Sequence, residues 1–166
     1  MEMPFIIDIE ASGFGRGSYP IEVGFARPDG SVASQLIKPE PEWTHWSDEA
    51  ERVHGISRQQ LAASGQSARE VALWLNRELD GQTLFSDSWG FDSSWLALLF
   101  HHAQCLQRFR IDTLNKLLSE KQLAHWSLMK QKVLDDLKLV RHRAADDAFM
   151  LQRTYCMTAA IPGDFS

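Results

Sequence analysis

The feature that most constrains the fold of this chain is an apolar segment near its N-terminus that ends in two acidic residues. The segment reads PFIIDIEASGFG and contains Asp8 and Glu10. Short runs rich in β-branched and aromatic residues are typical of strands, whose side chains alternate between two faces. Ile6, Asp8 and Glu10 therefore share one face, and the two carboxylates lie about 6.6 Å apart along the strand. A fold that buries this strand must therefore keep both carboxylates in contact with solvent or neutralise them with a cation.

Both outcomes remain open for this segment alone. Two divalent ions in a phosphodiester-cleaving centre lie about 3.5–4 Å apart, so one carboxylate can bridge them while the other binds one side. Alternatively, the strand ends at Asp8 and both acids are solvated, because short motifs often occur without function. The rest of the chain has to decide between these interpretations.

Length and composition limit the class of protein. With 166 residues the chain can form one well-packed domain, so we expect a single domain over 1–166. No stretch approaches the roughly 18 apolar residues of a membrane span, and we expect no membrane partner. The N-terminus has no leader pattern, and Cys105 and Cys156 have no metal-site or disulfide spacing, which favours a cytoplasmic location. A net charge of −5 argues against tight binding to duplex nucleic acid.

The order of the predicted elements indicates the fold class. Three strand-like segments separated by turn signals come first, at 3–10, 20–27 and 31–38. Helical periodicity begins at Ala68, and the later segments alternate: a helix over 68–79, a strand over 82–86, a helix from Asp92 to Ala103, a strand passing into a helix over 109–118, a polar helix over 121–138 and a final helix over 143–160. This order predicts an α/β fold in which three antiparallel strands and later parallel strands form a central mixed sheet flanked by helices.

Two later acids fall on inward helical faces. Asp92 shares an apolar stripe with Leu96, although an acid in a first helical turn is also favoured by the helix dipole. In the final helix, the rotation of 100° per residue puts Asp147 beside the core face and Asp146 nearly opposite, so Asp147 is the candidate ligand. His142 precedes this helix. An imidazole can take a proton from water near neutral pH, but a surface histidine is the common alternative.

Together these residues resemble the DnaQ-like exonucleases of the DEDDh type, in the ribonuclease H-like superfamily. The resemblance is carried by FIIDIEASGFG, VHGIS, FDSSWL and HRAADDA, which occur in the family's order. It implies a ribonuclease H-like fold and a 3′→5′ exonuclease that acts on single-stranded DNA or RNA. It further implies that two Mg²⁺ or Mn²⁺ ions are held by four acids, Asp8, Glu10, Asp92 and Asp147, with His142 activating the attacking water. Several small relatives are dimers, so a homodimer is compatible with it.

The resemblance also indicates substrate contacts. Ser12 and Gly13 follow the first acids. His54 matches a family loop near the terminal nucleotide, and a histidine that caps a turn is an equally good explanation of this residue. Phe14 and Trp89 each follow a catalytic segment in a predicted loop, which makes them candidates for base stacking. The chain departs from the family at Ala11, Ser12 and Gly13, where many members have Thr-Thr-Gly, and at Asp87 and Ser88, where many have His-Asn. These departures bear on substrate preference and remove no metal ligand.

Two other classes of function compete with the exonuclease. One is a non-catalytic nucleic-acid-binding module on the same fold, which the presence of all four acids and His142 disfavours. The other is a phosphohydrolase with an aspartate nucleophile, as in the haloacid dehalogenase-like enzymes. That family has a second aspartate where this chain has Glu10, and it would leave the final motif unexplained.

Overall fold

The fold is built on a five-stranded mixed sheet. The computed structural model describes residues 3–139 and 142–162. The strands lie in the order β3-β2-β1-β4-β5, with antiparallel pairing from β1 to β3 and parallel pairing from β1 through β4 to β5. Their bounds are β1 Ile6–Ala11, β2 Pro20–Ala26, β3 Val32–Leu36, β4 Thr83–Ser86 and β5 Arg110–Thr113. The predicted α/β class with a mixed sheet is therefore confirmed.

Helices cover the sheet and fill the connections between strands. Their bounds are α1 Asp48–His54, α2 Arg58–Ser64, α3 Ala68–Leu79, α4 Trp89–Ala103, the 3₁₀ helix η1 Leu114–Leu117, α5 Glu120–Leu137 and α6 Ala144–Ala159. The sequence analysis assigned no element to α1 and α2. Where a strand passing into a helix was predicted over 109–118, the helical part is only the short 3₁₀ helix η1. None of the helices in the described ranges is long and apolar enough to span a membrane.

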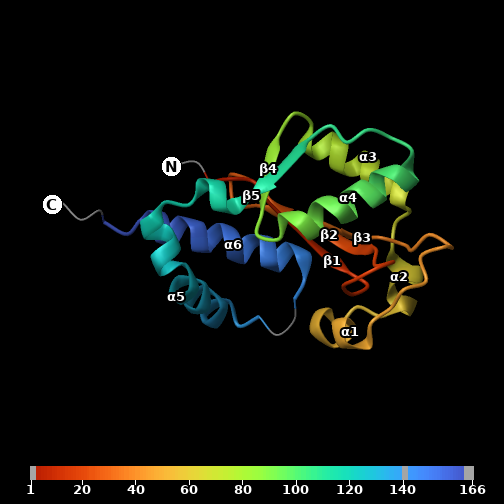
Figure 1. Ribbon diagram of the computed structural model, residues 1–166, viewed down its shortest axis with the longest axis horizontal. Coiled ribbons are helices and arrows are strands. Elements are labelled where there is room, and N and C mark those ends of the chain that lie inside the picture. The colour runs from red at the N-terminus through yellow and green to blue at the C-terminus, as the bar shows by residue number, and fades with distance from the viewer. Residues whose placement is uncertain (1–2, 140–141, 163–166) are drawn as a thin grey trace.

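The alternation of β1 explains how a buried strand carries two charges. Ile7 and Ile9 pack into the larger core with α3 and α4. Ile6 points the other way, into a smaller core with α5 and α6. Figure 1 shows α3 and α4 together on one side of the sheet and α5 and α6 on the other. Asp8 and Glu10 continue the face of Ile6 toward α6, where the smaller core gives way to a cleft.

The first turn of α6 lies directly on β2. A Cβ atom built on Gly24 would lie 2.5 Å from the backbone nitrogen of Ala145 and 2.7 Å from the carbonyl carbon of Ala144. Only glycine leaves room for this approach, since nonbonded heavy atoms normally stay about 3.5–4 Å apart. The glycine in the predicted strand at 20–27 therefore determines how closely the helix that carries Asp147 approaches the sheet.

Candidate metal centre and substrate cleft

Strand β1 supplies the central acids and then turns sharply. The pairing of β1 with β2 shifts register between Glu10 and Ala11. Bulges of this kind bend a strand and redirect its side chains. Gly13 follows with φ of +151°, and a Cβ atom there would lie 2.7 Å from Ser47 Cβ, so the turn requires glycine. The chain therefore leaves the sheet after Ala11, the residue next to Glu10, and the end of β1 lines the cleft.

The other two predicted ligands reach β1 from two helices. Asp92 lies in the first turn of α4 and is 1% exposed. Its Oδ2 accepts a hydrogen bond of 2.6 Å from the Ser86 hydroxyl at the end of β4, and this contact fixes the orientation of the carboxylate. Asp147 lies in the first turn of α6 and is buried, whereas Asp146 is exposed, which is the orientation that the helical rotation predicts.

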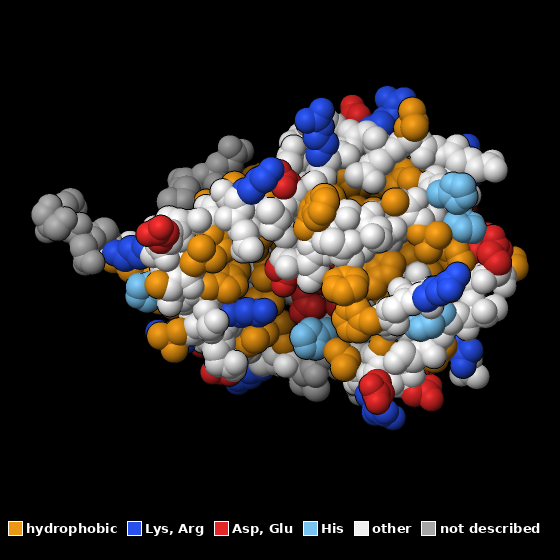
Figure 2. All heavy atoms as spheres, viewed as in Figure 1, with side chains coloured by type: hydrophobic (Ala, Val, Ile, Leu, Met, Phe, Trp, Pro, Cys, Tyr) orange, Lys and Arg blue, Asp and Glu red, His pale blue; other side chains and the backbone are white. Residues whose placement is uncertain are grey.

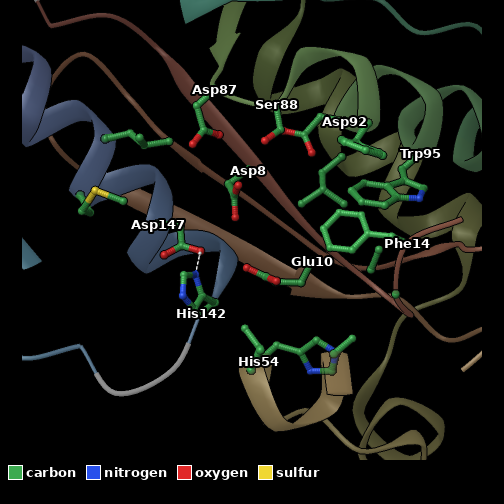
Figure 3. A pocket seen from close by; sticks show the side chains of 18 of the residues that line it. Asp8, Glu10, Phe14, His54, Asp87, Ser88, Asp92, Trp95, His142 and Asp147 are labelled. Atoms are coloured by element: carbon green, nitrogen blue, oxygen red, sulfur yellow. Dashed lines mark ion pairs between the residues drawn. The ribbon is translucent and has the colours of Figure 1, made fainter. Parts of the chain in front are cut away.

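The carboxylates form two triads that share Asp8. In one, ligand atoms of Asp8, Glu10 and Asp147 all lie within 4.8 Å of one another, and in the other the same holds for Asp8, Asp87 and Asp92. Figure 3 shows Asp8 in the middle, with Asp87 and Asp92 on one side and Glu10 and Asp147 on the other. A third group with metal-site spacing, Glu40, Glu42 and His102, lies elsewhere, and His102 Nε2 already accepts a hydrogen bond from Trp43.

Burial and mutual repulsion raise the pKa of every predicted ligand. Burial is the main cause for Glu10, whose pKa rises to about 9, with Asp147 adding to the rise. The pKa of Asp92 rises to about 7, mainly by burial, although the Ser86 hydrogen bond lowers it. Burial and the charge of Glu10 raise the pKa of Asp8 well above its usual value, and burial also raises that of Asp147. Without a cation, the site holds protons at neutral pH.

This donor set fits divalent metal ions. Hard cations such as Mg²⁺ and Mn²⁺ bind carboxylate oxygens. Asp8 Oδ2 is buried and has no hydrogen-bond partner among the described residues, which is costly unless a ligand satisfies it. A cation between the triads would satisfy this oxygen and remove the repulsion that raises the pKa values. Asp8 belongs to both triads, so it could contribute to a cation site on either side.

His142 lies at the rim of the site. Its Nδ1 is 3.4 Å from Asp147 Oδ2, and its side chain is 65% exposed. Its backbone N–H donates to the Val53 carbonyl of α1, so His142 is attached to a helix that also lines the cleft. The imidazole is therefore accessible to solvent and oriented by a site carboxylate at the same time.

An ion pair that sequence reasoning missed positions the start of α6. Glu22 of β2 is 2% exposed and accepts hydrogen bonds from the Arg143 side chain, the shortest of them 2.6 Å. It also accepts from the backbone N–H of Ala144, at 2.9 Å, and so caps a helix whose own N-cap residue makes no side-chain cap. The signal was present, because an acid in the apolar segment PIEVGF needs a partner.

The acids lie at one side of a cleft with an aromatic wall. The cleft measures about 440 Å³. Phe14 and Phe91 line it, are 72% and 52% exposed, and contact each other and Trp95 with ring centroids 5.2–6.2 Å apart. Figure 2 shows acidic side chains at the bottom of the hollow, with hydrophobic side chains and a histidine around it. Lys130 is the only lysine or arginine among the described residues that line the cleft.

The predicted substrate residues divide into two groups. Gly13, Phe14 and His54 line the cleft with the acids. Ser12 and Trp89 do not: Ser12 is buried and hydrogen-bonds His45, and Trp89 donates to the Ile111 carbonyl. Trp95 of α4 is 8% exposed, packs in the larger core and also contributes to the cleft wall. Phe91 was missed, although it directly precedes Asp92 in the quoted motif.

The comparisons with known proteins find similar structures but no similar sequence. No family model matches the chain, and no curated protein matches it significantly. Exonuclease I of E. coli in complex with a dT13 oligonucleotide is similar with a TM-score of 0.67 and 12% identity, over 96% of this chain and 41% of that chain. The complex with dA16 gives 0.58 and 13% over 80% and 30%, and Exonuclease I of Methylocaldum szegediense gives 0.59 and 15% over 76% and 30%.

The low sequence identities and the partial coverage limit the similarity to the fold. The chain spans less than half the length of each of these exonucleases. The similarity covers 76–96% of this chain, at sequence identities that establish only the fold. The resemblance that the motifs predict is thus confirmed at the level of the fold, and the chain has the ribonuclease H-like α/β fold of these exonucleases.

Proposed function

We propose that the chain is a metal-dependent 3′→5′ exonuclease of the DEDDh type that hydrolyses the terminal phosphodiester of single-stranded DNA or RNA. The observation that carries the proposal is the pair of carboxylate triads sharing Asp8 at the side of an open cleft. A purely structural role would not favour so many mutually repelling acids around one buried, unpartnered oxygen.

Each residue has a role in this proposal. The four acids Asp8, Glu10, Asp92 and Asp147 hold two divalent ions, Mg²⁺ or Mn²⁺, which when bound supply the positive charge that activates water and stabilises the leaving oxygen. His142 is the general base. Because its Nδ1 faces Asp147, its Nε2 is available to take a proton from the attacking water. A positioned base of this kind contributes about 10²–10⁴-fold in rate.

The aromatic wall supports a single-stranded substrate. Exposed aromatic rings stack unpaired bases, with about 1–3 kcal/mol per base. Phe14 and Phe91 provide such rings next to the acids, whereas a duplex end would hide the faces of its bases. The similarity to an exonuclease I bound to dA16 and dT13 supports the same substrate class.

Degradation of end-labelled oligonucleotides tests the proposal. Single-stranded DNA and RNA labelled at the 5′ end are incubated with the protein and Mg²⁺, Mn²⁺ or chelator. We expect labelled products that shorten stepwise from the 3′ end with either metal and not with chelator. Asp146→Asn is the matched control for Asp147→Asn, because it removes the same charge from the exposed side of α6. Cleavage that persists in Asp147→Asn, or no cleavage of either nucleic acid by the wild type, contradicts the proposal.

A further inference from the structure

A fifth carboxylate lies among the four predicted ligands. Asp87 follows β4 and precedes α4, in the short connection that also contains Ser88. A ligand oxygen of Asp87 lies within 4.8 Å of those offered by Asp8 and Asp92. In Figure 3 its carboxylate points toward Asp8. In the sequence, Asp87 is one of the departures from the family pattern, since many members have histidine there.

The surroundings of Asp87 favour a bound cation over a solvated surface acid. Asp87 is exposed, and its carboxylate makes no hydrogen bond or ion pair with another described residue, but it lines the cleft and faces two buried carboxylates, Asp8 and Asp92. In the same triad, Ser86 already donates to Asp92 Oδ2. Independently, the buried Asp8 Oδ2 lacks any partner in the described part of the chain. A divalent ion can satisfy this oxygen while it also binds the neighbouring carboxylates.

We propose that Asp87 is a direct ligand of the ion held by Asp8 and Asp92, so that each of the two ions has three carboxylate residues around it. The inference rests on the proposed function only for the presence of two ions. The affinity of a carboxylate site for a hard cation increases with the number of charged ligands. With Asp87 the ion on the α4 side has three carboxylate ligands, and we expect it to bind tightly. A neutral side chain at this position would leave that ion only two.

Calorimetric titration of Mn²⁺ into metal-free protein tests this inference without substrate. We expect two ions per wild-type chain. In Asp87→Asn we expect one ion to bind with nearly unchanged affinity and the other to bind at least about tenfold more weakly, because a single ligand is lost from one triad. Asp146→Asn, which removes the same charge from an exposed position, should bind both ions like the wild type. Melting in EDTA shows that each variant is folded.

Comparing the affinities of the two Mn²⁺ ions in Asp87→Asn distinguishes a direct ligand from a nearby charge that acts only through its electric field. A nearby charge that is not a ligand acts on both ions, so equal weakening of both in Asp87→Asn overturns the inference, as does unchanged binding of both. The proposed function fails separately: if the expected Mn²⁺ pattern occurs while no oligonucleotide is shortened, Asp87 is a ligand and the chain is no exonuclease. If oligonucleotides are shortened and Asp87→Asn binds both ions normally, only the present inference is wrong. A wild-type chain that binds no Mn²⁺ overturns both.

Discussion

Removal of the metal ions should make the stability of this protein fall as the pH rises. In the metal-free protein the pKa of Asp92 is raised from 3.8 to about 7, mainly because the carboxylate is buried. The folded chain therefore keeps this proton over a range in which the unfolded chain has lost it. Because the folded state binds more protons, the free energy of unfolding decreases with pH between these values and is constant for this group above and below them.

The size of the effect follows from that pKa difference. A rise from 3.8 to about 7 corresponds to about 4 kcal/mol, since each pH unit contributes about 1.4 kcal/mol. For a chain of this length, 1 kcal/mol shifts Tm by about 2–4 °C, so Asp92 alone should lower Tm by roughly 10 °C. Glu10, whose pKa is raised to about 9, extends the decline above neutral pH.

Thermal melting in EDTA and in Mn²⁺, at several values between about pH 4 and pH 9, measures this effect. In EDTA the wild-type Tm should decrease across the range, and Asp92→Asn should decrease less because one of the titrating groups is gone. In Mn²⁺ the decrease should largely vanish, since the ions stabilise the charged carboxylates. A metal-free wild type with the same Tm at both ends of the range, or a variant with the wild-type slope, refutes the reasoning.

Three further predictions concern single residues. Asp8→Asn should abolish nuclease activity and most of the Mn²⁺-dependent rise in Tm, while Asp146→Asn leaves both unchanged, as oligonucleotide gels and melting curves can check. His142→Ala should lower kcat by about 10²–10⁴-fold and flatten the acidic limb of the pH profile, with Mn²⁺ affinity maintained in calorimetry. Arg143→Gln should destabilise the fold by about 3 kcal/mol in urea unfolding, because it leaves the buried Glu22 carboxylate without its cation.

The elements with long periodic patterns could be predicted from the sequence. Helix α3 begins at the predicted Ala68 and ends at the predicted Leu79. The antiparallel order of the first three strands followed from turn signals such as PDG, and Gly30 adopts the positive φ of 86° that such a turn requires. These features depend on residues close together in the chain, so local reasoning is sufficient.

Helices α1 and α2 show where periodicity fails. Each has only seven residues, about two turns, which is too short for an apolar stripe to be recognised. Their ends carried a different signal. Ser47 and Ser57 accept hydrogen bonds from the backbone N–H groups of the first turns, and Gly55 ends α1 with a positive φ of 72°. Capping residues would have located both helices where the apolar pattern could not.

The candidate site was partly predictable for the same reason. Alternation in β1 puts Asp8 and Glu10 on one face, and rotation in α6 turns Asp147 toward the core, both from local geometry alone. The position of Asp87 beside Asp8 depends instead on the parallel pairing of β1 with β4, which brings together segments about eighty residues apart in the sequence. No pattern within either segment specifies that pairing.

The position of α6 is subject to two opposing requirements. The site needs Asp147 close to Asp8, but repulsion between their carboxylates destabilises the fold. Metal-free carboxylates repel one another, which would push Asp147 and its helix away from β1. Gly24 allows α6 to approach the sheet closely, and the ion pair of Glu22 with Arg143 holds the first turn there. This attachment involves none of the proposed metal ligands. The chain can therefore keep Asp147 near Asp8 before an ion arrives, which reduces the reorganisation that metal binding has to drive.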